Sequence, residues 1–189
     1  GRPIINSMSM EEVAPGVTKV DAVIAATSEH DPVYIALCAG PKGPAATRED
    51  KARIARDVVK NAARHGVGPE RILIDMNVFP LGSESDPTMN FALESLESIP
   101  LIKAIHPDLK TSCGVGNLTN GLASKPYMRK VLTSVWLDEG RKRGLDAART
   151  RQPPQGLLPR RVSTPRRTRP GRAMAPRDRL WYKLSCSAS

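Results

Sequence analysis

Polar side chains stand at the ends of three short apolar runs in this sequence. Asp75 follows Ile72-Leu73-Ile74 directly, Asn6 ends an earlier run, and Asn117 follows a later one. A carboxylate in such a place is costly to desolvate unless a donor pairs with it. It can accept two parallel N–H bonds from the edge of an amino-pyrimidinone ring, much as it accepts an arginine. One acid and several amides therefore indicate a site that reads the hydrogen-bonding edge of a flat heterocycle.

A purely structural interpretation exists for each of these residues. Asp75 could cap the turn that follows it, and Asn6 or Asn117 could bond the backbone of a Gly-rich turn. In parallel α/β folds, ligands lie at the carboxyl ends of the strands. Because all three polar residues lie at the ends of predicted strands, a shared binding site is favoured over three unrelated caps.

Cysteine usage indicates a reducing compartment. Cys38, Cys113 and Cys186 are an odd, widely spaced set without a CxxC pair, which is typical of free thiols rather than of a disulfide frame or zinc site. No metal site is expected. The sequence has neither an apolar run long enough to cross a membrane nor a signal peptide, so a cytoplasmic location without membrane contact is expected.

The elements that would position these polar residues alternate regularly. Short apolar runs at 3–9, 32–39, 71–78 and 111–118 predict four strands, separated by about 30 to 40 residues, which a strand and its crossover helix require. Buried-looking strands that alternate with helices predict a parallel sheet covered by helices.

Three of the intervening helices carry clear signals. Thr47 and Asp50 resemble a capping box, with Gly66 ending the helix. Asp86 and Pro87 predict the start of a second helix. Each helix has an apolar stripe that is expected to be core: the second contains Met89, Leu93, Leu96 and Ile99, and the third contains Met128, Val131, Leu132, Val135 and Trp136.

The fold class predicted is α/β, either part of a (β/α)8 TIM barrel or a small open sheet. A complete barrel needs eight strands and about 250 residues, so four units would form half of one. The expected domain is residues 1–148. An incomplete barrel leaves unpaired sheet edges, which predicts association or poor solubility.

The net charge of +10 lies entirely in residues 149–189. Basic and acidic residues balance before that point, whereas the tail has ten arginines and a single acid, Asp178. Its prolines and lack of periodicity predict a disordered Arg/Pro-rich tail. One hypothesis is an out-of-frame reading of a G+C-rich gene. The alternative is an arm that binds nucleic acid by phosphate neutralisation, with Trp181 and Tyr182 nearby. We favour the first.

Several motifs together resemble a known family. They are INSMS, ALCAGPKGPAATREDKARIA, ILIDMNVFPLG, KTSCGVGNLTNGL and GLDAA, in this order, within residues 1–148. They resemble the pterin-binding barrel family, specifically the methyltetrahydrofolate:corrinoid protein methyltransferases and the folate domain of cobalamin-dependent methionine synthase. The resemblance implies a barrel of which this chain carries about the fourth to seventh β/α units.

The resemblance also implies roles for particular residues. Asn6 and Asp75 would contact the pterin, and Asn117 would hydrogen-bond the methyl-bearing ring nitrogen. Asn120 and Lys125 would line the entrance of the same site. The substrate would be methyltetrahydrofolate, and the acceptor would be cobalt of a corrinoid on a partner, a corrinoid iron-sulfur protein or cobalamin-binding protein. The enzyme itself would need no metal, would form a homodimer when complete, and would be an incomplete piece here.

Two other functions are weighed against this one. Dihydropteroate synthase shares the barrel and pocket, but that family is expected to carry a lysine-bearing loop after the aspartate strand and a Ser-Arg-Lys cluster later. Those places read DMNVFPLG and GVGNLTNG here, so a synthase-like pterin enzyme ranks second. A purely structural or interaction module would tolerate alanine at Asp75 and Asn117.

Overall fold

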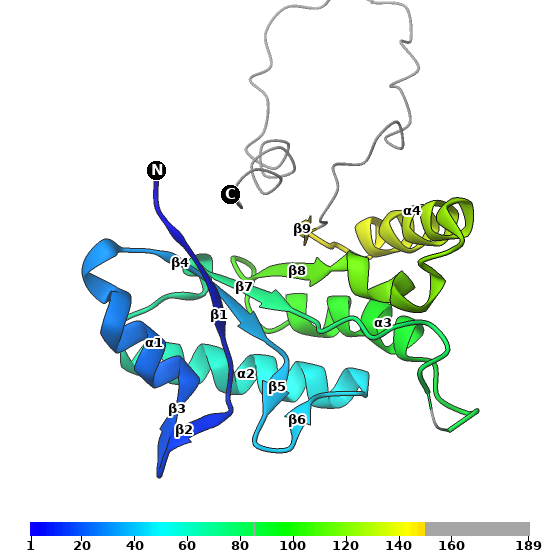
Figure 1. The fold of residues 1–189 in the computed structure, drawn as a ribbon. Coiled ribbons are helices and arrows are strands. Elements are labelled where there is room, and N and C mark those ends of the chain that lie inside the picture. The colour runs from blue at the N-terminus through cyan, green and yellow to red at the C-terminus, as the bar shows by residue number, and fades with distance from the viewer. Residues whose placement is uncertain (85, 150–189) are drawn as a thin grey trace, which may run out of the picture.

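A parallel five-stranded sheet is the centre of the fold. The computed structural model describes residues 1–84 and 86–149. The strands are β1 (Ile4–Met8), β4 (Val33–Leu37), β7 (Ile72–Asp75), β8 (Lys110–Gly114) and β9 (Ala147–Arg149). They lie in the order β1-β4-β7-β8-β9, and each pairs in parallel with the next (Figure 1). Strand order therefore equals chain order, as in a wound barrel and unlike a sheet whose order reverses at a switch point.

A helix connects each strand to the next. These helices are α1 (Lys19–Thr27), α2 (Arg48–Arg64), α3 (Phe91–Lys103) and α4 (Pro126–Lys142), with short 3-10 segments η1 (Ser28–His30), η2 (Pro69–Arg71) and η3 (Val115–Leu122). The main core lies between the helices and one face of the sheet, where Ile72, Ile74 and Cys113 pack. A smaller cluster of Ile35, Leu73 and Ala147 marks the opposite face, which would be the inside of a barrel.

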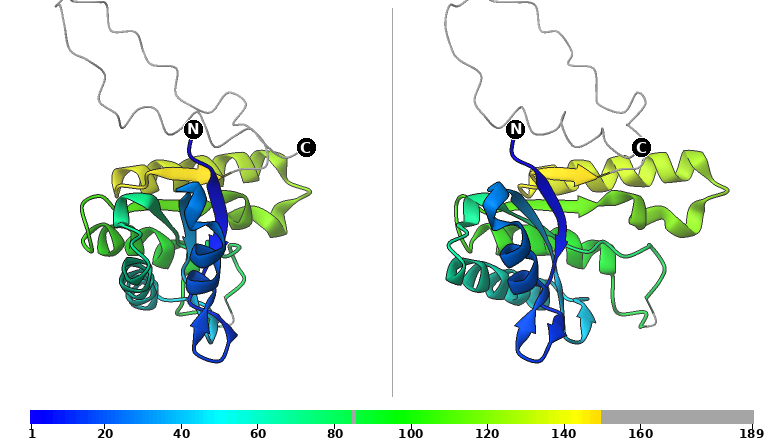
Figure 2. Two further views of the ribbon diagram at one scale, coloured as in Figure 1. Left: turned by 90° about the vertical axis from the view of Figure 1, so that its left-hand side faces the viewer. Right: turned by 60° about the vertical axis from the view of Figure 1, so that its left-hand side comes forward.

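Connections after the strands gather at one end of the molecule. The antiparallel hairpins β2 (Glu12–Ala14) with β3 (Val17–Thr18) and β5 (Ala39–Gly40) with β6 (Gly43–Pro44) follow β1 and β4. Figure 2 shows both hairpins at the same end as the long loop that follows β7. This end is the carboxyl edge of the parallel strands.

Local sequence signals placed four strands of the main sheet and the start of α2 correctly. All four predicted strands form, and α2 begins after Thr47, whose side chain accepts a hydrogen bond from the Asp50 amide. The turn after α2 uses Gly66 at φ +73°, the left-handed conformation that glycine tolerates. The prediction of four parallel strands was one short, because β9 adds a fifth.

Two helix predictions were wrong. Helix α3 is capped by Asn90 and not by Asp86, because the Asp86 carboxylate instead accepts hydrogen bonds from the amide and hydroxyl of Thr88 and closes a turn. On α4 the predicted core stripe is largely at the surface: Met128, Val131 and Val135 are 48%, 40% and 58% exposed, while Trp136 is buried. Leu93 of α3 is also exposed.

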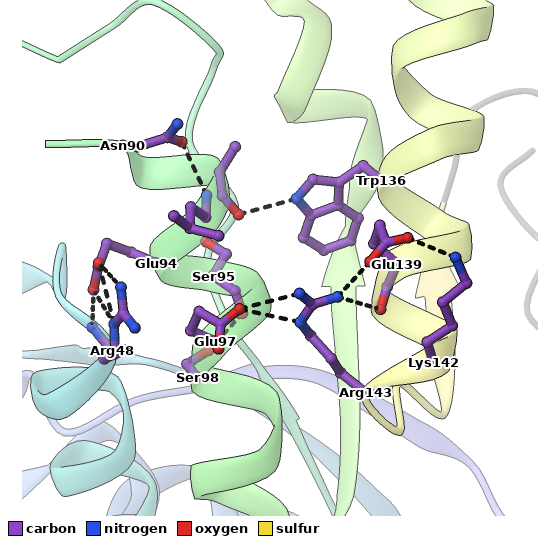
Figure 3. Close-up of polar contacts among 12 residues, drawn as sticks. Arg48, Asn90, Glu94, Ser95, Glu97, Ser98, Trp136, Glu139, Lys142 and Arg143 are labelled. Carbon is purple, nitrogen blue, oxygen red and sulfur yellow. Dashed lines mark hydrogen bonds and ion pairs between the residues drawn. The ribbon is translucent and has the colours of Figure 1, made fainter.

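Polar contacts fasten α3 to its two neighbouring helices (Figure 3). Glu94 pairs with Arg48 at the start of α2 and also accepts from the Arg48 amide at 2.7 Å. On the other side, Arg143 bridges Glu97 of α3 and Glu139 of α4 at 3.1 and 2.7 Å. The indole Nε1 of Trp136 donates to the carbonyl of Ala92 at 3.1 Å, which gives this buried N–H a partner.

Two expectations fall wholly or mainly outside the described residues. The expected disorder of the tail and its out-of-frame origin concern residues 149–189, of which the structure describes only Arg149, the last residue of β9.

Among the described helices, none is both long and apolar enough to cross a membrane.

Candidate functional site

A cavity of about 400 Å³ opens at the carboxyl edge of the sheet. Its polar lining comes from Glu11, Asn77, Asn117 and Asn120, and its apolar lining includes Leu37, Val78 and Phe79. Leu37 ends β4, and the other residues named belong to connections after β1, β7 and β8, which meet because the strands are parallel. A mostly apolar hollow with a few convergent polar groups is the usual form of a small-molecule site.

Asp75 closes β7 and is only 3% exposed. Its Oδ1 accepts a hydrogen bond from the Asn77 amide at 3.0 Å, so the turn-capping role that the sequence left open is present. Its Oδ2 lies 3.7 Å from Nη2 of Arg149. Burial raises the pKa of Asp75, and the Asn77 amide and the charges of Arg149 and Lys51 oppose that rise. One carboxylate oxygen is thus fixed by backbone, and the other faces a cation.

Ser112 lies beside Asp75 and was missed at the level of sequence. The two residues are register partners in β7 and β8, so their side chains point to the same face of the sheet. Ser112 is 5% exposed, and its Oγ has no hydrogen-bond partner. Buried hydroxyls are normally satisfied, so an unpartnered one next to a buried carboxylate marks this face for a ligand. No pattern in the sequence separates this serine from its neighbours.

Asn117 and Asn120 are exposed residues of η3 and both line the cavity. A Cβ built on Gly114 would lie 3.5 Å from Nδ2 of Asn117 and 3.5 Å from Nη2 of Arg149. Both nitrogens therefore approach the same glycine at the end of β8. The η3 segment is also tied to the loop after β7, because the Leu81 amide donates to the Leu118 carbonyl at 2.9 Å.

The structure does not bring all five predicted residues into this cavity. Asn117 and Asn120 line it, whereas Asn6, Asp75 and Lys125 are not among its lining residues. Asn6 is exposed on the edge strand β1, paired in register with Ile35 and thus on the barrel-inner face. Lys125 is exposed and precedes the first turn of α4. Asp75 itself does not line the cavity, but Asn77 does, and the Asn77 amide donates to the Asp75 carboxylate.

Glu11 is a second residue that the sequence interpretation missed. It lines the cavity, and one carboxylate oxygen accepts from the hydroxyl of buried Ser9 at 2.7 Å. The signal was a further acid two residues past the polar end of the first apolar run. Glu11 thus adds a carboxylate to the polar part of the lining, whose other members are the amides of Asn77, Asn117 and Asn120.

The buried thiols are poor candidates for chemistry. Burial raises the pKa of Cys38 to about 12 and raises the pKa of Cys113 well above its ordinary value, so both remain protonated at neutral pH and lack thiolate character. In residues 1–84 and 86–149, no three His, Cys, Asp or Glu side chains gather as metal ligands would.

The fold and site together define a ligand-binding α/β domain whose polar groups lie beyond the carboxyl ends of parallel strands. The chain belongs to the pterin binding enzyme family, whose model matches residues 1–151. The match runs slightly past the domain boundary expected at 148.

Individual relatives are similar over most of this chain. Methionine synthase of Mycobacterium tuberculosis (strain ATCC 25618 / H37Rv) is 32% identical over 149 residues, and that of Mycobacterium leprae (strain TN) is 30% identical over 149 residues. These alignments span 78% of this chain but 12% of each relative. The methylcorrinoid:tetrahydrofolate methyltransferase of Eubacterium limosum is 29% identical over 129 residues, which is 67% of this chain and 44% of the relative.

Proposed function

We propose that this domain binds methyltetrahydrofolate and takes part in methyl transfer between that folate and the cobalt of a corrinoid. The observation that carries the proposal is Asp75, a buried carboxylate whose register partner Leu37 and hydrogen-bonded neighbour Asn77 both line the cavity. Membership of the pterin binding enzyme family supports a pterin as the ring that this carboxylate would bind. The names of the relatives support methyl transfer as the reaction. A carboxylate can accept two N–H bonds from the amino-pyrimidinone edge of a pterin.

The proposed roles follow the chemistry of the departing group. The methyl group of methyltetrahydrofolate sits on a tertiary amine, which leaves poorly until that nitrogen gains a strong hydrogen bond. Asn117, exposed on η3 and lining the cavity, would donate its amide N–H to this nitrogen as charge moves onto it. A hydrogen bond that strengthens as charge develops favours the transition state over the bound substrate.

The remaining predicted residues would bind rather than react. Asp75 would hold the ring edge, with Asn6 on the same inner face, and Asn120 and Lys125 would flank the entrance. The corrinoid, carried by a partner, supplies the cobalt that exchanges the methyl group with the folate nitrogen. Because a binding site for the transition state serves both directions, the domain can be assayed with either methylated reactant.

The partner and assembly belong to the same proposal. A corrinoid iron-sulfur protein or a cobalamin-binding protein or domain would deliver the cobalt at the carboxyl edge of the sheet, with a homodimer as the complete form and a cytoplasmic location. The matched segment is a small part of the methionine synthases, and the described sheet has five of the eight strands that a closed barrel needs.

Calorimetric titration of the full chain with methyltetrahydrofolate tests the proposal. We expect binding in the micromolar range, about 8 kcal/mol. The Asp75→Asn variant should bind at least about tenfold more weakly, since it loses the charge that accepts the ring N–H groups. Asn117→Ala should bind well but transfer methyl groups slowly. Equal affinity in wild type and Asp75→Asn would remove Asp75 from the site, and no folate binding by wild type would refute the function.

A further inference from the structure

Lys51 of α2 is a buried cation whose partners are backbone carbonyls. Its side chain is 0% exposed. Nζ donates to the carbonyls of Ala45 at 2.7 Å, Met76 at 2.8 Å and Asn77 at 3.5 Å. An ammonium group has three N–H donors, and these three carbonyls account for all of them.

Burial of an ammonium group is expensive, so this arrangement has to be compensated by the bonds it makes. The carbonyls that it reaches have no place in the sheet. Strand β7 ends at Asp75, the chain turns at Asn77 with φ +50°, and the carbonyls of Met76 and Asn77 leave the ladder. A buried carbonyl without a donor is costly, and Lys51 supplies donors to two in succession.

The same ammonium group contacts two segments that adjoin the cavity. Asn77, Val78, Phe79 and Pro80 form one wall, and Nζ of Lys51 lies 5.1 Å from the centroid of the Phe79 ring, within cation–π range. In the other segment, its partner Ala45 follows Pro44, another lining residue. Met76, Asn77 and Phe79, which follow β7, and Ala45, which follows β6, thus converge on a single buried charge.

We propose that Lys51 is a positioning residue that holds the segment 76–80 in the shape required to bind the ligand of this cavity. It acts through the loop and does not itself touch the ligand. The inference rests on the proposed function only in the choice of methyltetrahydrofolate as the probe, because the shape of the loop can be measured without a ligand.

Lys103 provides a matched control. Its Nζ also donates to a backbone carbonyl, that of Leu109 at 2.9 Å, and pairs with Asp146 at 2.8 Å. Leu109 and Asp146 precede β8 and β9, so this lysine fastens the opposite, amino edge of the sheet. Lys103→Met removes a comparable set of bonds far from the cavity.

The experiment compares Lys51→Met with Lys103→Met in the full chain. Hydrogen exchange of the amides of residues 76–79 should be at least about tenfold faster in Lys51→Met than in wild type and unchanged in Lys103→Met. Methyltetrahydrofolate should bind about tenfold more weakly to Lys51→Met alone. Lys51→Arg, which keeps charge and donors, should recover part of the affinity.

Equal exchange at residues 76–79 and equal affinity for the two methionine variants would overturn the inference. If Lys51→Met does not fold, wild type titrated from pH 7 to 10 replaces it. A deprotonated amine keeps only two N–H donors, so the amide shifts of Asn77 and Val78 should change with the ionisation of Lys51, and constant shifts would overturn the inference. If wild type binds no folate, the proposed function fails while the exchange comparison still decides the role of Lys51.

Discussion

Nη2 of Arg149, at the end of β9, lies 3.7 Å from Oδ2 of Asp75, at the end of β7. Strand β8 separates the two strands, so the contact spans the inner face of the sheet. A guanidinium presents parallel N–H groups, as the edge of an amino-pyrimidinone does. The chain therefore places its own donor next to the carboxylate that is proposed to bind the pterin.

Replacement of Arg149 by Gln should raise the pKa of Asp75 further. Burial already raises this pKa, and the positive charge of Arg149 opposes the rise, so its loss leaves desolvation less compensated. Carboxyl 13C NMR across a pH titration measures the change. Arg143→Gln is the control, because Arg143 pairs with Glu97 and Glu139 on the helix side. An unchanged pKa in Arg149→Gln would show that the pair does not persist in solution.

The Asp75→Asn variant should be at least as stable as wild type at neutral pH while it loses ligand. The folded-state pKa of Asp75 is raised above its ordinary value, so the native state holds this proton more tightly than the unfolded state does. The contribution of Asp75 to stability therefore falls as pH rises through the folded pKa. In Asp75→Asn this pH-dependent loss of stability is absent, and the side-chain oxygen of the new residue can still accept from the Asn77 amide.

Urea unfolding of wild type and Asp75→Asn between pH 3.5 and 7 measures this difference. The free energy of unfolding of wild type relative to the variant should decline as pH rises. A wild type that gains stability over the variant across this range would contradict the assigned direction of the pKa.

Replacement of Ser112 by Ala should stabilise the ligand-free protein by about 1 kcal/mol, since it removes a buried hydroxyl that lacks a partner. Ser98 is the matched control: it is also buried, but its Oγ donates to the Ser95 carbonyl at 2.7 Å. Ser98→Ala should destabilise by about 1 kcal/mol. Thermal or urea unfolding distinguishes the two, and a similar loss in both would mean that Ser112 is satisfied in solution.

Lys51 should make stability rise with pH in the alkaline range. Burial lowers its pKa to about 8 from 10.5, against the opposing influence of Cys38, Asp75 and Glu94. Between these two values the unfolded state binds more protons than the native state, so this group's contribution increases the free energy of unfolding as pH rises. Urea unfolding at pH 7.5 to 10 should show the increase in wild type and not in Lys51→Met. Parallel curves would refute the lowered pKa.

The exposed apolar side chains of α4 should tolerate polar substitution. Val135 is 58% exposed and Trp136 is 5% exposed, so Val135→Thr should change stability by less than about 0.5 kcal/mol, while Trp136→Ala should cost about 3 to 5 kcal/mol. Sedimentation should be measured at several protein concentrations alongside stability. If a second copy of the chain covers Val135, Val135→Thr should change the oligomeric state. A large loss of stability without such a shift would contradict the position of α4.

The parts of the fold that were predictable are those that depend on neighbours in sequence. Thr47 identified the start of α2 because its side chain bonds an amide three residues away. Strand β9 has no such signal. It consists of Ala-Ala-Arg and is placed by Asp146, whose carboxylate accepts from the Thr111 amide at 2.9 Å and from Lys103. Both partners lie more than thirty residues away, where the local pattern carries no information.

The candidate site shows the same division. Asn117 and Asn120, which line the cavity, could be singled out because polar residues at the ends of apolar runs are visible in the sequence. Lys51 could not, because a lysine within an amphipathic helix is usually at the surface, and only the tertiary structure reveals the three carbonyls around it. The stripe on α4 failed for the opposite reason, since apolar periodicity shows which residues share a face and not whether another element covers that face.

Strand order has a consequence for how this domain is made. Because each strand of the main sheet pairs with the preceding strand, every new pairing closes a loop of one helical crossover, and such short closures cost little entropy. A nascent polypeptide could therefore dock each unit as it leaves the ribosome, with no need to wait for a distant partner. Translation and assembly would run in the same direction.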